Sequence, residues 1–305
     1  MWHAYGIIVD FYLENGVLNL PLDIGSGVKI EAVPEWINTG DYLDNFSPSE
    51  RDEISCAKFA FSTSYAAEAI GSRDLEWKGQ EPRSIQSAID EKFSLAGLAL
   101  WISKPSKFSC GPKLHFEVSN DPGSFRQSSV SEKIRVSESE SEGFPSEEDF
   151  ASAKDILKAL LSLERSGNVF MAIKILLHGL QDSVMEIRYL SHWIVLESLF
   201  GPEETNETTY RLSQRICFFL RDKPDDRNAL FKEIKKCYQF RSKIVHGMRS
   251  SKSIKNQQDA LLIKSESLIR ESLARILTDA SLVSAFDGKG RDEYLESLIF
   301  GNLMP

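Results

Sequence analysis

The sequence has few of the features that place a protein in a membrane or outside the cell. Among its 305 residues, no apolar run approaches the roughly 18 residues that span a bilayer. The best candidates, 6–13 and 95–102, are short, and Asp10 interrupts the first. The start of the chain lacks the basic residues and the cleavage site of a signal peptide, so we expect a cytoplasmic protein.

Cysteine is scarce as well. The four cysteines are too few and too scattered for a disulfide framework or a zinc site, and we interpret them as small buried hydrophobic residues: Cys56, Cys110, Cys217 and Cys237. No other stretch has the spacing of metal ligands. We therefore expect no metal ion and no cofactor.

The sequence also has no excess of basic over acidic residues. The chain has 36 Lys and Arg against 45 Asp and Glu, a net charge of −9, which on totals argues against a nucleic-acid partner. The distribution changes this inference, because residues 1–148 carry a net −11 and residues 149–305 a net +2. Within 211–255, thirteen basic residues face four acidic ones, which is the kind of surface that phosphate binding requires.

The length and the hydrophobic content, 42%, favour two domains with sizeable cores, and we expect an α+β two-domain protein. Residues 1–127 are predicted to form a β-rich domain with one helix at about 84–101 and with strands at 6–13, 17–22, 28–33, 56–61 and 113–118. This domain has no glycine-rich phosphate loop and no cluster of His and carboxylates. We expect it to sense, target or regulate.

Residues 128–148 have a different composition. They hold seven Ser and six Glu, which bury too little apolar surface to offset the entropy of ordering them. We interpret them as a linker or a mobile loop; a phosphorylated regulatory tract is the alternative.

From residue 146 onward the apolar pattern has the period of a helix. Ser146 with Asp149, and Ser183 with Glu186, have the spacing of capping boxes. The predicted helices are 147–166, 169–179, 184–200, 208–222, 226–247, 256–279 and 291–299. Residues 149–305 are therefore predicted to be an all-helical bundle.

One predicted helix, 226–247, carries an Arg and a His that point to chemistry. Arg241 and His246 are five residues apart, a rotation of about 140° and a rise of about 7.5 Å, so they need not touch but could flank one groove. His246 precedes Gly247 at the expected helix end, where the dipole favours an imidazolium near neutral pH. A surface cation and a partly buried histidine are the plainer interpretation.

The run 238–247, Tyr-Gln-Phe-Arg-Ser-Lys-Ile-Val-His-Gly, strongly resembles the R-x(4–6)-H motif of HEPN domains in the form typical of the Apea-like HEPN family. Two further stretches, 193–200 and 210–216, resemble the family's preceding helices in the same order. The resemblance covers about 149–298.

This resemblance implies a helical bundle that forms a homodimer and brings the Arg and His of two protomers to one cleft. It implies a metal-independent endoribonuclease with Arg241 and His246 as the catalytic pair, acting as a regulated toxin or an anti-phage effector under a partner protein or a phage trigger. The imidazole would transfer protons while the guanidinium binds the phosphate, and the 2′-hydroxyl of the RNA would be the nucleophile. A non-catalytic module that dimerises and binds RNA or a nucleotide is the alternative.

Three neighbours are predicted to support the pair. Glu197 either orients Arg241 or is an exposed helix residue, Tyr238 either stacks on a base or packs in the core, and Ser242 is the polar residue after the Arg. The predicted RNA-binding residues are Arg215, Lys236, Lys243 and Arg249. For Arg215 a surface salt bridge is an equal alternative. His178 and His192 are interpreted as structural.

Overall fold

The computed structural model describes residues 2–11, 13, 20–66, 85–104, 108–117, 134–135, 145–202, 208–247 and 252–301. The chain divides into two compact units, 1–161 and 162–305. Helix α4 (Glu147–Ser162), expected to open the helical bundle, thus belongs to the first unit apart from its last residue. There, Lys154 forms an ion pair of 2.8 Å with Asp23.

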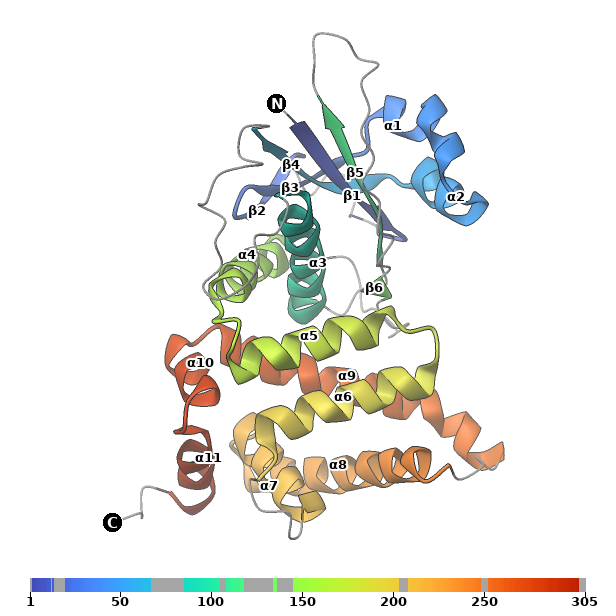
Figure 1. Cartoon of the computed structure of the whole chain (residues 1–305). Coiled ribbons are helices and arrows are strands. Elements are labelled where there is room, and N and C mark those ends of the chain that lie inside the picture. Colours follow the sequence, from blue (N-terminus) through green and yellow to red (C-terminus); the bar gives the residue numbers. More distant parts are fainter. Residues whose placement is uncertain are drawn as a thin grey trace. The chain divides into compact units, whose positions relative to one another are not determined.

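The described strands of the first unit form one antiparallel sheet (Figure 1) in the order β2-β3-β4-β1-β5-β6. They are β1 (Trp2–Val9), β2 (Leu22–Gly25), β3 (Val28–Ala32), β4 (Phe59–Tyr65), β5 (Ser109–Glu117) and β6 (Ile134–Arg135). The strand predicted at 6–13 begins earlier and ends at Val9, and the one predicted at 56–61 begins later, at Phe59. Much of the run predicted at 17–22 lies outside the described residues.

Helices cover both faces of the central strand β1. Tyr5 and Ile7 pack in a cluster with residues of α1 (Glu35–Thr39), the 3-10 helix η1 (Asp41–Asn45) and α2 (Pro48–Cys56). The alternate positions face α3 (Ile85–Ser103), and a Cβ on Gly6 would collide with Phe93. A strand buried on both faces has no reason to alternate, which explains why β1 is an almost continuous apolar run.

The two short helices α1 and α2 were not predicted. Yet α2 has a strong start signal, because Ser47 and Glu50 form a capping box and Pro48 occupies the first turn. The Glu50 amide donates to the Ser47 hydroxyl at 3.4 Å, and the Ser47 amide donates to the Glu50 carboxylate at 3.1 Å. This signal lies between two predicted strands and was overlooked.

The face of β5 toward α3 carries polar side chains, and these include one pair of a His and a carboxylate. His115 Nε2 lies 3.0 Å from the Asp90 carboxylate, and Lys113 donates to the Ser94 hydroxyl at 2.8 Å. Both β5 residues are buried. Asp90 and His115 are 25 positions apart in the sequence, so the local sequence pattern does not show this pair.

The expected Ser/Glu-rich linker is described only in part. Residues 134–135 form β6, which pairs with Ser109 and Cys110, and α4 begins at Glu147. The capping box of Ser146 and Asp149 is confirmed, with the Ser146 amide 2.8 Å from the Asp149 carboxylate and the Asp149 amide 3.2 Å from the Ser146 hydroxyl. Most of 128–144 lies outside the described residues.

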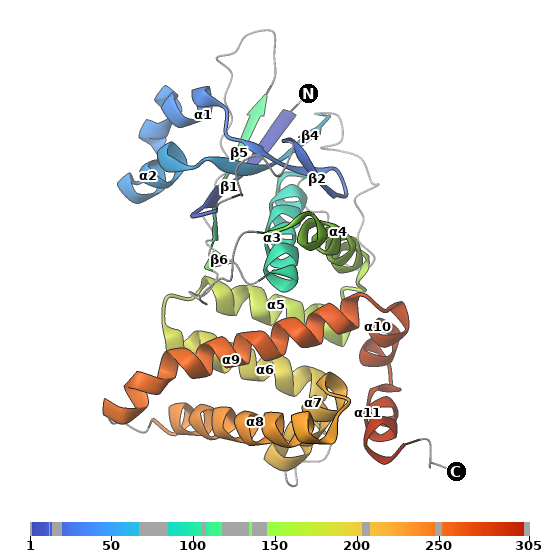
Figure 2. The ribbon, with the colours of Figure 1, turned by 180° about the vertical axis from the view of Figure 1, so that it is seen from behind.

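The described part of the second unit is helical, as predicted (Figures 1 and 2). Its helices are α5 (Asn168–Gln181), α6 (Met185–Phe200), α7 (Thr208–Leu220), α8 (Pro224–Val245), α9 (Lys252–Leu277), α10 (Ala280–Asp287) and α11 (Arg291–Phe300). Helix α5 packs along α6, α7 along α8, and α9 against α6. No described helix is both long and apolar enough to cross a bilayer.

The prediction for the start of α6 is wrong. Val184 is the N-cap and no side chain caps the helix, so Ser183 and Glu186 form no capping box. The Asp182 carboxylate instead accepts the Val184 amide at 2.7 Å, which closes the turn before the helix. The separate helix α10 was also not predicted.

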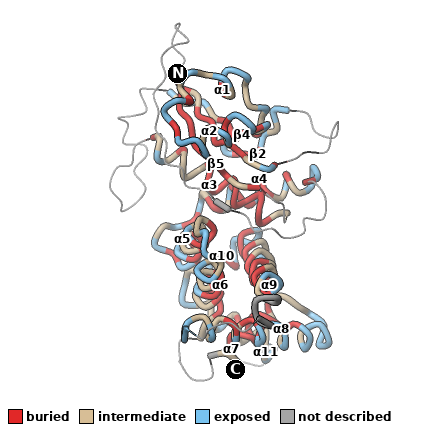
Figure 3. The backbone as a smooth tube through the Cα atoms, turned by 90° about the vertical axis from the view of Figure 1, so that its right-hand side faces the viewer, coloured by how far each residue is buried: buried red, intermediate tan, exposed pale blue. Residues whose placement is uncertain are grey.

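Buried residues gather on the sheet and α3 in the first unit and on the inward sides of α6 and α9 in the second (Figure 3). Cys110, Cys217 and Cys237 are among them, and burial raises the pKa of the first two thiols to about 12 and that of Cys237 to about 11. Cys56 is exposed, so its predicted burial is wrong.

Candidate functional site

Helix α8 has a buried face and a basic exposed face. The buried residues recur at helical spacing: Leu230, Ile234, Cys237 and Phe240. Nine polar residues are exposed, of which four are lysines and three are acidic: Asp225, Asp226, Asn228, Lys232, Glu233, Lys235, Lys236, Gln239 and Lys243. The exposed polar side chains after Glu233 are basic or neutral. The two lysines predicted to bind RNA, Lys236 and Lys243, thus lie on a solvent-facing basic surface.

Arg241, near the end of α8, is held by Glu197 of α6. Its Nη2 lies 3.2 Å from Oε1 and 3.3 Å from Oε2 of the carboxylate. Each side chain is 26% exposed, so the pair lies at the rim of the bundle rather than in its core. This geometry agrees with the expectation that Glu197 orients Arg241.

Tyr238 lies one turn before Arg241 and completes the cluster. The Arg241 guanidinium lies 5.5 Å from the centroid of its ring, and Trp193 of α6 packs against the same ring edge to face at 5.2 Å. Burial raises the pKa of Tyr238, and the nearby Glu197 charge raises it further. Of the two interpretations of Tyr238, stacking on a base or packing within the protein, packing is the one that agrees with these contacts.

Trp193 is the residue of this cluster to which the sequence assigned no role. It precedes Glu197 by one helical turn, so both lie on the same side of α6. An aromatic residue four positions before a carboxylate in an apolar helix was the available signal. Its ring supports Tyr238, and through Tyr238 it supports the guanidinium.

Arg241 keeps unused hydrogen-bond donors. Nη2 is the nitrogen that bonds to Glu197, while Nε is buried and has no hydrogen-bond partner within the described chain. A guanidinium has five N–H groups in a planar fork that matches the oxygens of a phosphate. Arg241 is therefore oriented by protein contacts without being saturated by them.

His246 lies immediately after α8 and is exposed. Its amide donates to the carbonyl of Ser242 at 3.1 Å, and Gly247 then takes a left-handed conformation, φ +63°, that ends the helix. Among the described residues no hydrogen bond or ion pair involves the His246 ring, and none joins it to Arg241. Ser242 is half-buried, and Arg249 lies outside the described residues.

Arg215 is not available for RNA. Its side chain is 4% exposed, both of its Nη atoms lie 3.2 Å from the Asp292 carboxylate, and Nη1 also donates to the Gly201 carbonyl. Burial alone would raise the pKa of Asp292, but hydrogen bonds from Arg215 and Arg291 lower it. The structure therefore agrees with the alternative for Arg215, a salt bridge. This salt bridge is buried rather than at the surface, and it joins α7 to α11.

The other two histidines of the helical unit lie apart from this site. His192 is buried, its Nδ1 lies 2.8 Å from the Ser265 hydroxyl, and burial with the nearby Arg188 charge lowers its pKa to about 3. This agrees with a structural role. His178 is exposed in the last turn of α5. No group of three or more potential metal ligands occurs among the described residues.

The chain was compared with protein-family models, with curated proteins and with solved structures. None of the three comparisons finds a match.

Proposed function

We propose that the helical unit is a HEPN-type, metal-independent endoribonuclease that cleaves RNA through attack of the 2′-hydroxyl on the adjacent phosphate. The observation that carries the proposal is Arg241: it is held by Glu197 and Tyr238, retains unused donors, and lies five residues before an exposed histidine at a helix end. The proposed class of protein is a regulated toxin or an anti-phage effector.

In this mechanism the two side chains divide the work. The Arg241 guanidinium donates to the phosphate oxygens, whose negative charge grows as the 2′-oxygen attacks. His246 takes a proton from the 2′-hydroxyl or gives one to the departing 5′-oxygen. The products are a 2′,3′-cyclic phosphate and a 5′-hydroxyl.

The exposed face of α8 supports an RNA substrate. Lys232, Lys236 and Lys243 lie along the helix that carries Arg241, and all three are exposed. Each lysine that pairs with a phosphate releases condensed counterions, so this face would attract RNA without reading its sequence. The net charge of the whole chain, −9, does not oppose this, since the basic residues are local.

Exposed apolar residues beside the cluster support a homodimer. Ile194, one turn before Glu197, is 45% exposed, and Val245, one turn after Arg241, is 52% exposed. These two side chains are candidates for part of a surface that a partner covers. A second copy placed there would bring a second Arg241 and His246 to the same cleft.

The test uses the full chain with total RNA and with tRNA in excess chelator. We expect wild-type protein to release fragments with 2′,3′-cyclic phosphate ends and to leave a 2′-deoxy substrate intact. Arg241→Ala should slow cleavage about 10²- to 10³-fold, as the loss of one charge-stabilising donor does. His246→Ala should slow it about 10²- to 10⁴-fold. His178→Ala, an exposed histidine in the same unit, is the matched control and should cut normally.

One result favours the second candidate, a non-catalytic module that binds RNA or a nucleotide. In that result the protein binds RNA without cleaving it. Substitution of Arg241 or Lys243 weakens the binding equally, and His246→Ala leaves the binding unchanged. The absence of contact between the Arg241 and His246 side chains in the described chain is the observation on its side. Cleavage by both alanine variants at the wild-type rate would overturn the endoribonuclease proposal.

A further inference from the structure

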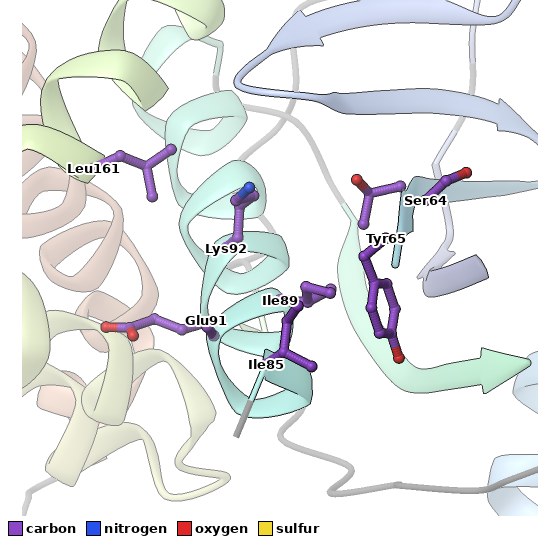
Figure 4. Close-up of a pocket in the computed structure, with 9 residues that line it drawn as sticks. Ser64, Tyr65, Ile85, Ile89, Glu91, Lys92 and Leu161 are labelled. Atoms are coloured by element: carbon purple, nitrogen blue, oxygen red, sulfur yellow. The ribbon is translucent and has the colours of Figure 1, made fainter. Parts of the chain in front are cut away.

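The first unit contains a pocket of about 360 Å³ between the C-terminal end of β4 and helix α3. Its lining is mainly apolar, with Ile85, Ala88 and Ile89 from α3 and Leu161 from α4, and its polar residues come from the end of β4 and from Glu91 and Lys92. Figure 4 shows Ile85 and Ile89 directed toward the ring of Tyr65, while Glu91 points away from it. This volume suits a ligand with one or two rings.

The aromatic wall of the pocket is held rigidly. The Tyr65 hydroxyl lies 2.9 Å from Nδ1 of His115, whose Nε2 lies 3.0 Å from the Asp90 carboxylate. The two ring nitrogens of His115 thus join Tyr65 and Asp90 in one hydrogen-bonded chain. Trp2 stacks on Tyr65 with ring centroids 6.1 Å apart. The ring is therefore pre-organised before any ligand arrives, which reduces the entropy lost on binding.

Lys92 brings a cation to this apolar pocket. Its Nζ donates to the carbonyl of Ser26 at 3.2 Å, and no carboxylate of the described residues lies within ion-pair distance. Burial lowers its pKa. A half-buried ammonium ion that lacks a counter-charge gains free energy when an anion replaces the water it has lost.

We propose that this pocket binds a small aromatic anion, with its ring between Tyr65 and the two isoleucines and its carboxylate or phosphate on Lys92. The ring would gain apolar burial and contact with a fixed aromatic wall. The anion would make charge-assisted hydrogen bonds with the ammonium. The site lies wholly in the first unit and does not rest on the proposed ribonuclease activity.

The test compares two probes that differ in charge alone, 2-naphthoate and its neutral amide, 2-naphthamide, by ligand-observed NMR titration of the full chain. Wild-type protein should bind the anion about tenfold or more tightly than the amide, the scale of one hydrogen bond to a charged group. Lys92→Gln should remove this preference and leave the affinity for the amide unchanged. Lys29→Gln, an exposed lysine on β3, is the matched control and should retain the preference.

A second variant tests the pocket itself. Ala88→Trp fills it from α3 and should abolish the binding of both probes, while circular dichroism and thermal unfolding report that the fold is intact. The proposal is overturned if wild-type protein binds the two probes equally or binds neither. It is also overturned if Lys92→Gln keeps the preference for the anion, or if folded Ala88→Trp binds as wild type does.

Discussion

Two of the arginine–carboxylate pairs in the helical unit differ in how completely the guanidinium is used. Arg215 is 4% exposed and bonds to both oxygens of Asp292 and to the carbonyls of Phe200 and Gly201. Arg241 is 26% exposed and reaches Glu197 through one nitrogen. The first pair fastens helices together, while the second holds a cation at the surface with donors to spare.

The histidines repeat this contrast. His192 is buried against Ser265, and its pKa is lowered to about 3, so it is neutral throughout the physiological range. His246 is exposed at a helix end. For arginine and histidine alike, the exposure of the side chain and the number of its donors that have partners separate a structural residue from a candidate for chemistry. The residue type alone does not separate the two.

The largest expected effect breaks the buried pair. Arg215→Met removes a buried cation and leaves Asp292, which is 27% exposed, with Arg291 as its remaining partner. The free energy of unfolding should fall by about 3 kcal/mol, the lower end of the range for breaking a buried pair. Urea unfolding followed by circular dichroism measures it. Arg215→Met/Asp292→Leu should recover part of the loss. A single variant as stable as wild type would contradict the structural role of Arg215.

The next effect concerns the surface pair. Glu197→Gln removes the charge that orients Arg241 and should slow RNA cleavage about 10²-fold, the scale of a misplaced catalytic group. The free energy of unfolding should change by about 1 kcal/mol or less, because the pair is partly exposed. Glu186→Gln, an exposed glutamate in the first turn of α6, is the control. A stability loss as large as that of Arg215→Met would erase the distinction between the two pairs.

The smallest effect is a pH dependence that arises at His192. Its pKa in the folded state, about 3, lies below the ordinary value of 6.5, so folding favours the neutral form. The stability this residue contributes is complete above pH 6.5 and falls as the pH drops toward 3, by about 2 kcal/mol between pH 7 and pH 5. His192→Asn should flatten the pH profile of unfolding over that range, whereas His178→Ala should leave it unchanged.

The helical unit was predictable, apart from α10, because most of its helices show their period locally. The helix predicted at 226–247 is found at Pro224–Val245, and the one predicted at 184–200 is found at Met185–Phe200. The strands of the first unit were less predictable, because β1 is buried on both faces and its apolar run shows no alternation. The starts of β1 and β4 were therefore misplaced.

The candidate site, like the fold, was predictable only in part. From the sequence alone, the resemblance predicts Arg241, His246 and Glu197 as a set. It did not distinguish Arg215 from Arg241, because both are arginines on helices with acidic residues elsewhere in the chain. The partner of Arg215 is 77 residues away, and only packing of α11 on α7 brings it within reach.

The sequence by itself determined the division into a mixed first part and a helical second part, the ends of most helices, and the local basic surface of α8, because these depend on residues a few positions apart. The tertiary structure alone decided which charged groups are saturated, that Asp90, His115 and Tyr65 join in one hydrogen-bonded chain, and that Lys92 faces an apolar pocket. Those properties depend on contacts between distant segments, which local periodicity does not encode.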